Sequence, residues 1–429
     1  MEEGERQYAG MRNVWILTAC MTSMAICYTM LIPFLPVYLL DLGATSENVA
    51  LWSGLVFSIT FFVAGIMAPI WGKLADKNGK RMMAIRAAFF IAIAYFLTGL
   101  VTSPAQLLLA RAWQGFANGF LPAAMTMVSL SVPKERVGSA IGIFQTGLIL
   151  GNVIGPFLGG LVANVVGMRP SFYFAGCVLL VITLVTWLFV KEPDIVEPTT
   201  TATAVETFND MEGESRSTKQ ATPVAPSESS IFDDIKVAMK NRVLVEILVL
   251  FFIFQSAILM LQPILSLYVG KLLGSMDSAA IISGTILSIG GIAGMVTTNI
   301  WTHYGQKRGY FRVITYASFG AGFFLLAQAL PISIWYFGIL QILVGACIVG
   351  VNPSLSAAAA VYTEPEFRGR VFGLVTTAQQ FGSMVGPLFA SVVTLLLGIS
   401  YVFMITGIIM IVVSYRIYKR HITDNNVVQ

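Results

Sequence analysis

Residues 142–160 read GIFQTGLILGNVIGPFLGG, an apolar segment in which glycines and a proline recur at short intervals. Part of this pattern returns at residues 373–387, GLVTTAQQFGSMVGP, with the same spacing. Membrane helices interrupted by Gly and Pro at matching places in two halves are typical of transporters. Small residues at every fourth position also let helix backbones approach closely. We therefore predict a gate formed by Gly142, Gly151, Gly155, Pro156, Gly159 and Gly160 in the first copy and by Gly386 and Pro387 in the second.

The composition is that of a membrane protein. The 429 residues are 56% hydrophobic and only 11% charged, whereas a soluble domain carries about 25% charged residues. The charges are clustered and leave apolar runs of roughly 20 residues, each long enough to span a bilayer as a helix. We predict an all-α integral membrane protein with twelve transmembrane helices. The expected spans are 14–40, 47–72, 82–102, 105–131, 137–166, 170–190, 243–270, 278–303, 311–330, 332–361, 368–397 and 400–418.

The basic residues predict the orientation in the membrane. All 26 Lys and Arg except Arg111, Arg169 and Lys271 fall on one side of these spans. By the positive-inside rule that side is cytoplasmic, and so are both termini. The chain is thus predicted to be a multi-pass protein that lies in the lipid bilayer of a cytoplasmic membrane. A bacterial membrane is the expected one. Its net charge of +4 then reflects topology, and no nucleic-acid partner is expected.

The two halves of the chain repeat at an offset of about 230 residues. PFLPVY at 33–38 matches PILSLY at 263–268, and Gly54 matches Gly284. Two parallel six-helix repeats around a cavity at the membrane midplane give this pattern. We predict an N-terminal six-helix bundle over 1–190 and a C-terminal one over 243–429. The polar segment 191–242 between them is expected to be a mostly disordered cytoplasmic linker, with a surface helix near its end.

The loop after the second span reads GIMAPIWGKLADKNGKR. Glycines at 72 and 79 allow a tight turn, and Asp76 can accept hydrogen bonds from a helix N-terminus or an arginine. This loop resembles the signature loop of the major facilitator superfamily. The Gly-Pro span resembles the antiporter motif of that family's drug:proton exporters, and the whole chain is similar to bacterial multidrug efflux pumps of the twelve-helix branch. The resemblance implies a conformational latch formed by Gly65, Gly72, Asp76, Gly79, Lys80 and Arg81.

Arg111 is the one strong charge that we place well inside the bilayer. Such a cation costs about 2.5–3.5 kcal/mol on insertion scales, so it usually faces protein or water and marks function. It resembles the family's fourth-helix arginine motif, which is linked there to proton coupling. The alternative is that Arg111 snorkels to the interface or caps neighbouring helices. No acid falls near the middle of a span, which leaves Asp41 and Glu246 as candidate proton carriers. Glu246 has the alternative role of pairing with Arg242.

The family arrangement implies a substrate cavity lined by the first, fourth, seventh and tenth spans. Methionine and aromatic side chains adapt to varied apolar ligands, and a few amides add hydrogen bonds. The candidate substrate-binding residues, with one from the eleventh span, are Tyr28, Tyr38, Gln114, Asn118, Met125, Gln255, Gln262, Asn352 and Gln379.

These features predict a secondary active exporter of small amphipathic molecules, driven by proton antiport through alternating access and working as a monomer without a cofactor or metal. One alternative is a dedicated exporter of one metabolite or lipid-linked sugar. Another is a non-transporting membrane sensor that uses the linker as a docking arm. An enzyme is not expected, because the two histidines lie at the periphery of the predicted spans and no cluster has metal-ligand spacing.

Overall fold

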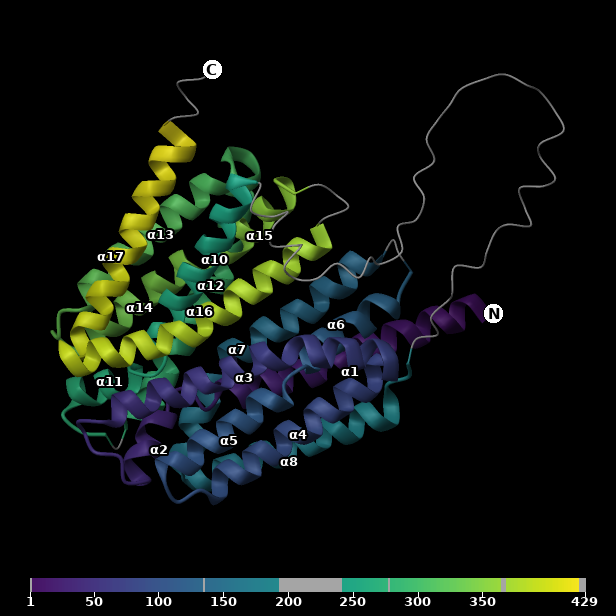
Figure 1. Cartoon of the computed structure of the whole chain (residues 1–429), viewed down its shortest axis with the longest axis horizontal. Helices are drawn as coiled ribbons and strands as arrows, with labels where there is room; N and C mark the ends of the chain where they lie inside the picture. The colour runs from purple at the N-terminus through teal and green to yellow at the C-terminus, as the bar shows by residue number, and fades with distance from the viewer. Residues whose placement is uncertain (1, 134–135, 193–240, 277, 364–367, 424–429) are drawn as a thin grey trace.

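The computed structural model describes residues 2–133, 136–192, 241–276, 278–363 and 368–423, which are helical with no strand among them. Figure 1 shows the chain as two groups of helices, one from each half of the sequence. The helices are α1 (Glu2–Thr29), α2 (Leu35–Asp41), α3 (Val49–Asn78), α4 (Lys80–Leu100), α5 (Pro104–Ala117), α6 (Phe120–Leu130), α7 (Val137–Val166), α8 (Met168–Phe189), α10 (Arg242–Met260), α11 (Leu265–Leu273), α12 (Ala279–Arg308), α13 (Tyr310–Gln328), α14 (Ile334–Ile348), α15 (Val351–Val361), α16 (Arg368–Leu396), α17 (Ile399–Tyr418) and the short π-helix η3 (Lys419–Thr423).

The predicted all-α membrane fold is confirmed. Ten stretches of the described chain are long and apolar enough to cross a membrane, counting α10 with α11 and α14 with α15 as one stretch each. The first and fourth predicted spans are present as the pairs α1–α2 and α5–α6. Most of the predicted linker, including the surface helix expected near its end, lies outside the described residues.

The first, fourth, seventh and tenth spans are not the continuous helices that the hydropathy predicts. Each is two helices, and the breaks fall at 30–34, 118–119, 261–264 and 349–350. Pro33 and Pro263 lie in two of these breaks, and a proline removes one backbone donor and clashes with the preceding turn. At the fourth span, Gly119 has φ +132°, a conformation that side chains with a Cβ rarely adopt.

Matching hydrogen bonds support the repeat. Tyr38 Oη donates to the Thr98 carbonyl at 3.0 Å, and Tyr268 Oη donates to the Gln328 carbonyl at 2.9 Å. The residue numbers in the two bonds differ by 230. Tyr38 is only 1% exposed and contacts Phe172. The structure therefore places it in the core of the first half, and does not support its predicted place in the substrate cavity.

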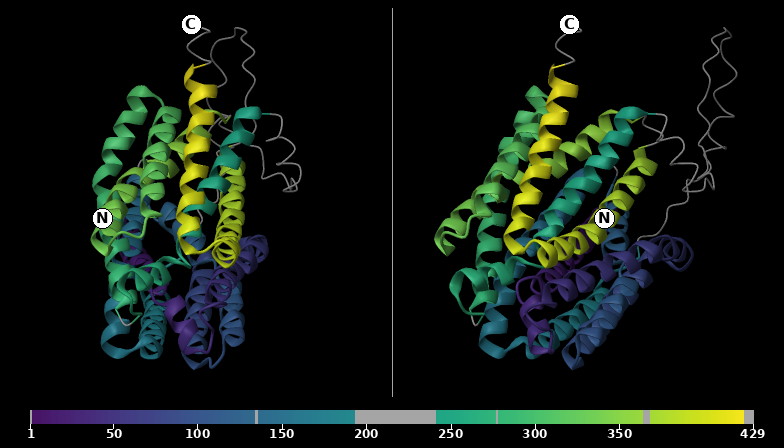
Figure 2. Two further views of the ribbon diagram at one scale, coloured as in Figure 1. Left: turned by 90° about the vertical axis from the view of Figure 1, so that its left-hand side faces the viewer. Right: turned by 60° about the vertical axis from the view of Figure 1, so that its left-hand side comes forward.

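The buried apolar side chains form two clusters. One is drawn almost wholly from residues before 191 and the other from residues after 243. Each half thus has its own core, which supports the proposed division into two bundles. Between the halves, α3 packs on α16 and α7 packs on α12, and Figure 2 shows the two groups meeting along these helices.

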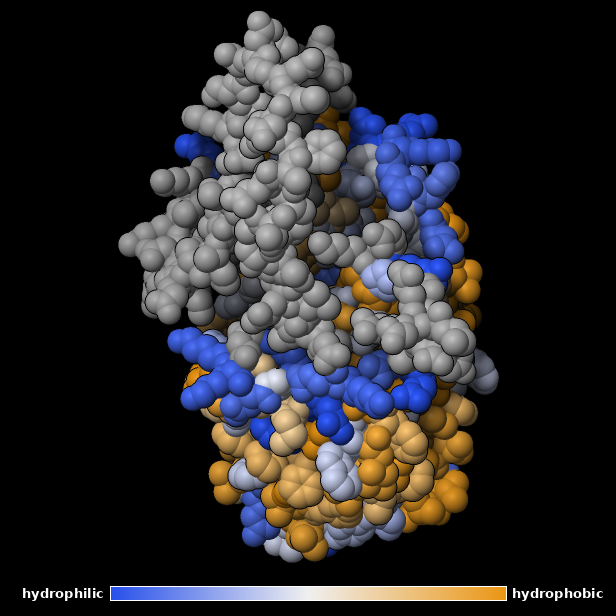
Figure 3. Space-filling view, turned by 90° about the vertical axis from the view of Figure 1, so that its right-hand side faces the viewer, coloured by the Kyte–Doolittle hydropathy of each residue, from blue (hydrophilic) through white to orange (hydrophobic). Residues whose placement is uncertain are grey.

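The molecule has two ends, which we name by their elements. The proximal end is where α1 begins, and the distal end is where α2 and α11 lie (Figure 1). Viewed from the proximal side, hydrophilic side chains form a band across the lower half of the molecule and a second group at the upper right, and apolar surface covers much of the part below the band (Figure 3). Because a bilayer favours apolar flanks between polar ends, this distribution agrees with helices that cross a membrane.

Candidate functional site

The glycines of the first Gly-Pro copy bring α7 into backbone contact with α1. A Cβ added at Gly151 would lie 2.5 Å from the Thr22 carbonyl oxygen, and one at Gly155 would lie 2.9 Å from that of Ile26. Gly159 lies against the backbone of Met30 in the same way. Real Cβ atoms do not approach backbone this closely, so these positions require glycine for the observed packing of α7 on α1.

The second copy packs α16 on α10 in the same manner. A Cβ at Gly382 would lie 2.6 Å from the Phe252 carbonyl oxygen, and one at Gly386 would lie 3.0 Å from the Cα of Ser256. The two copies of the motif therefore do equivalent packing within their own halves.

The proline turns of both copies face the opposite half. A Cβ at Gly54 of α3 would lie 2.6 Å from the Pro387 carbonyl oxygen, and one at Gly284 of α12 would lie even closer to the Pro156 carbonyl oxygen. A Cβ added at Gly160 would lie 2.8 Å from the Ala280 carbonyl oxygen of α12. The Gly-Pro helices thus serve as the contact surfaces between the halves.

Three serines absent from the predicted site bond across these contacts: Ser58, Ser288 and Ser391, whose Oγ donates to the Ala50 carbonyl at 2.6 Å. Ser288 Oγ donates to the Val153 carbonyl at 2.5 Å and accepts from the Phe157 amide at 3.1 Å. This hydroxyl therefore bonds to both backbone groups of one i to i−4 pair of α7. In the other contact, Ser58 Oγ donates to the Met384 carbonyl at 2.6 Å. The separation of 230 between Ser58 and Ser288 is the signal that would have found them.

The halves are closed at the distal end and apart at the proximal end. All the contacts between the halves described above lie in the distal parts of α3, α7, α12 and α16. By contrast, a Cβ at Gly65 or Gly72 of α3, at Gly142 of α7 or at Gly373 of α16 would meet nothing within 4 Å. The motif glycines at the distal end are therefore tightly packed, whereas those at the proximal end face open space.

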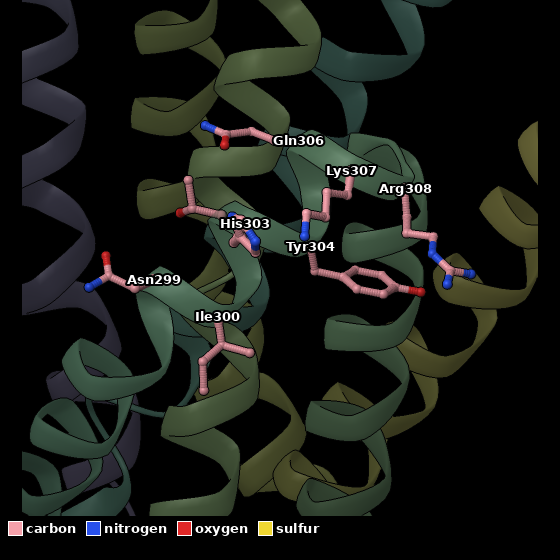
Figure 4. A pocket seen from close by; sticks show the side chains of 8 residues that line it. Asn299, Ile300, His303, Tyr304, Gln306, Lys307 and Arg308 are labelled. Carbon is pink, nitrogen blue, oxygen red and sulfur yellow. The ribbon is translucent and has the colours of Figure 1, made fainter.

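The proximal part of α12 lines an open groove of about 810 Å³. Figure 4 shows Asn299 and Gln306 on one side of this helix and Tyr304 and Arg308 on the other. His303 and Lys307 also line the groove. All of its lining residues belong to α12.

Arg111 is buried in the first half, with 6% of its surface exposed. Its Nη1 donates to Gln114 Oε1 at 2.7 Å. Its Nε and Nη2 are buried and have no hydrogen-bond partner among the described residues. The guanidinium therefore neither snorkels to an interface nor caps a helix, and two of its donor groups remain available.

A small, partly enclosed cavity of about 10 Å³ adjoins Arg111. Tyr28, Val56 and Thr60 are among its lining residues. This volume is enough for roughly one water molecule. Tyr28 is itself 39% exposed, so its ring lies between the buried arginine and more open space.

The acids lie away from this arginine. In the part of the chain that the structure describes, no Asp or Glu occupies the middle third of a helix. Asp41 is exposed at the distal end of α2. Asp76 is near the proximal end of α3, and its side chain is not among those described.

Glu246 has partners that the sequence analysis did not identify. Its carboxylate lies 3.0 Å from Arg420 Nη1 and 3.2 Å from His421 Nε2. The suggested pairing with Arg242 is therefore corrected to pairing with Arg420 and His421 of η3. Sequence spacing within one helix cannot reveal partners 175 residues away.

The signature loop fastens the proximal ends of α4 and α8 together. Gly79 has φ +88° at the turn between α3 and α4. The Lys80 amide donates to Glu192 Oε1 at 2.6 Å, and Arg81 donates to the Trp187 carbonyl. A carboxylate at a helix N-terminus is favourable because it satisfies free backbone donors there. Of the predicted latch residues, Lys80 and Arg81 thus contact the end of α8 and the residue Glu192 that follows it, in the same half of the chain.

The remaining predicted cavity residues have different surroundings. Asn118 caps the break between α5 and α6, where its Oδ1 accepts from the Gly119 amide at 2.8 Å. Met125 packs against the first core. Gln255 donates to Ser383 Oγ at 3.2 Å and so links α10 to α16. Asn352 carries a buried Oδ1 with no partner among the described residues.

Gln262 and Gln379 are half-buried, in the α10–α11 break and in the proximal part of α16 respectively. Gln114, in contrast, is buried against Arg111. The structure therefore joins Tyr28, Gln114 and Arg111 in one place and distributes the other candidates over several helices.

The helix breaks and the Gly-Pro packing recur in both halves, and comparison with known families agrees with this repeat. The model of the Major Facilitator Superfamily matches residues 17–334 and 312–423. The chain belongs to the major facilitator superfamily. The predicted family is thus confirmed, and the protein is a multi-pass membrane protein.

Similar proteins include curated relatives named multidrug resistance protein MdtG. The one from Proteus mirabilis (strain HI4320) is 32% identical over 384 residues, covering 89% of this chain and 88% of the relative. The one from Dickeya zeae (strain Ech586) is 31% identical and covers 94% of this chain and 93% of the relative.

Solved structures share the fold at lower sequence identity. A point mutant of the nucleoside transporter NupG superposes with a TM-score of 0.72 at 15% identity, covering 95% of this chain and 99% of that one. A bacterial homolog of the human lysosomal transporter Spinster, solved in an inward-facing and unoccupied conformation, gives a TM-score of 0.69 at 15% identity with 96% of each chain covered.

Proposed function

We propose that the chain exports small amphipathic molecules across the cytoplasmic membrane by alternating access, as a monomer with a multidrug range. The relatives named multidrug resistance proteins support the substrate range. The observation that carries the mechanism is the contrast along the Gly-Pro helices. Their distal glycines are tightly packed and their proximal glycines face open space.

In this proposal the structure corresponds to the state that loads substrate from the proximal side. The basic residues favour a cytoplasmic proximal end, so this state is inward-open. To release substrate outside, the contacts of α3 with α16 and of α7 with α12 must separate while the proximal ends close. Ser58 and Ser288 would then lose the carbonyls of Met384 and Val153.

Proton antiport is the proposed driving reaction. Asp41 lies at the distal end and Glu246 is held by two basic side chains, so neither faces the buried arginine. We assign to Arg111 the conformational part of coupling and not the carrying of the proton, because a guanidinium keeps its protons. Its unpartnered donors can bond a group or water that enters beside Tyr28 and Gln114. A buried cation with unused donors favours a change of partners between two states.

The test is dye efflux from proteoliposomes that contain the purified protein under an imposed pH gradient. The proposal expects gradient-dependent efflux of a fluorescent amphipathic dye, and loss of that dependence in Arg111→Ala. Efflux unchanged without a gradient would overturn proton coupling. A folded protein that moves no dye would favour the dedicated exporter of one metabolite, and retention of transport after deletion of residues 199–229 would argue against a sensor that depends on the linker.

A further inference from the structure

A groove on the C-terminal half lies apart from the central opening. It is formed by α10 and α17 and has a volume of about 710 Å³. Figure 2 shows α10 framed between α16 and α17 on the outer side of this half. Because Val249 and Val412 in its lining are exposed, the groove opens toward the surrounding bilayer.

The groove is cationic at its mouth and aliphatic along its length. Arg242, Arg416 and Arg420 line the proximal part, together with Glu246. The single glutamate is paired with Arg420 at 3.0 Å. Within the described residues, no carboxylate forms an ion pair with Arg242 or Arg416, so the mouth retains an excess of positive charge.

The length of the groove along α10 matches the thickness of one membrane leaflet. From Arg242 to Ile253 the groove follows α10 over twelve residues, and the eleven steps between them span about 16 Å at the helical rise. Half of a hydrocarbon core is about 15 Å. The arginines therefore lie at the depth of lipid headgroups when the valines and Ile253 lie beside an acyl chain.

The charges are not a by-product of the repeat. At the equivalent turns of α8, residues 185–190 read VTWLFV and carry no charge. Glu246 likewise corresponds to the apolar Ile16 of α1. Only Arg12 of α1 corresponds to a groove arginine, namely Arg242. The C-terminal half thus has a cluster of arginines that helix packing alone does not require.

We propose that this groove binds an anionic phospholipid, with its phosphate between Arg242 and Arg416 and one acyl chain along Val249, Ile253 and Val412. Arginine recognises phosphate through several donors in a planar fork. Anionic lipids are drawn to basic residues at the cytoplasmic surface. The bound lipid would connect α10 with α17, and so stabilise the half that must move as a unit.

The experiment measures lipid retention by the full-length protein in detergent. Native mass spectrometry would follow titration with phosphatidylglycerol or with phosphatidylcholine of the same acyl chains. We expect phosphatidylglycerol to bind at least tenfold more tightly. Arg242→Gln with Arg416→Gln should abolish that preference, whereas Arg12→Gln with Lys419→Gln should leave it intact. These control residues are exposed, also lie at the proximal end, and do not line the groove.

A second variant tests the apolar part separately. Val249→Trp fills the groove without altering its charge and should weaken phosphatidylglycerol binding severalfold, while 10 mM inorganic phosphate should not compete. Equal binding of the two lipids, an equal effect of both double variants, or displacement by phosphate alone would each overturn the proposal. Thermal unfolding of every variant in detergent separates loss of the site from loss of the fold.

Discussion

Ser288 of α12 bonds through its hydroxyl to both the Val153 carbonyl and the Phe157 amide of α7, at 2.5 Å and 3.1 Å. Both bonds fall in the turn that contains Pro156, where the helix lacks one backbone donor. A side chain of one half thus takes part in the hydrogen-bond ladder of a helix in the other half. Ser58 makes the matching donor bond to the Met384 carbonyl in the other contact between the halves.

Ser288→Ala should weaken closure of the distal end. One net hydrogen bond contributes about 1 kcal/mol, which corresponds to roughly a fivefold shift in a two-state equilibrium. The labelling rate of a cysteine placed at Ala280, measured with an impermeant maleimide in a background without native cysteines, should rise by that factor. Thr285→Ala is the control, because Thr285 bonds the Ile281 carbonyl of its own helix. Equal rates in the two variants would contradict the role of Ser288.

Gly155→Ala should impair transport strongly, because its Cβ meets the Ile26 carbonyl at 2.9 Å and Thr29 Oγ1 even closer. We expect at least a tenfold loss of dye efflux with near-normal insertion, and the same from Pro156→Leu. Gly138→Ala on the same helix meets nothing within 4 Å and should transport normally. If Gly155→Ala and Gly138→Ala behave alike, close packing of α7 on α1 is not needed for the cycle.

Arg111→Ala should abolish gradient-driven efflux, since it removes the buried charge together with its hydrogen bond to Gln114 Oε1. Arg111→Lys should retain part of the activity because it keeps the charge. The measurement is the ratio of efflux with and without a pH gradient. Arg169→Ala serves as the control at the distal end of the same half. Retention of the full ratio in Arg111→Ala would remove Arg111 from the coupling mechanism.

Glu246→Gln should lower thermal stability slightly and leave proton coupling intact. The carboxylate is 11% exposed and its partner Arg420 is 43% exposed, so the pair contributes on the order of 1 kcal/mol or less. Unfolding temperature and gradient-dependent efflux would be measured on the same preparation. Loss of coupling with an unchanged unfolding temperature would instead identify Glu246 as the proton carrier.

Tyr38→Phe should reduce stability without changing the range of substrates. It removes the bond from Tyr38 Oη to the Thr98 carbonyl and leaves that buried acceptor without its partner, at a cost of about 1–3 kcal/mol. Tyr28→Phe, next to Arg111, is the informative comparison. A changed dye preference in Tyr38→Phe and none in Tyr28→Phe would reverse our assignment of the two tyrosines.

The sequence alone determined the number and order of the spans, the repeat and the motifs. These depend on contiguous stretches of apolar residues and on spacings along one chain, which local composition encodes directly. The Gly-Pro motif belongs to this class, since Gly155 and Gly386 can be recognised by their intervals alone.

Only the tertiary structure decided which side chains meet. Glu246 pairs with Arg420, Ser288 bonds to Val153, and Tyr38 turns into a core and not toward the cavity. Such partners are separated by many residues, and their distances depend on how the helices pack and cross. The tertiary structure also decided which end is closed, because one sequence must be compatible with every state of an alternating-access cycle.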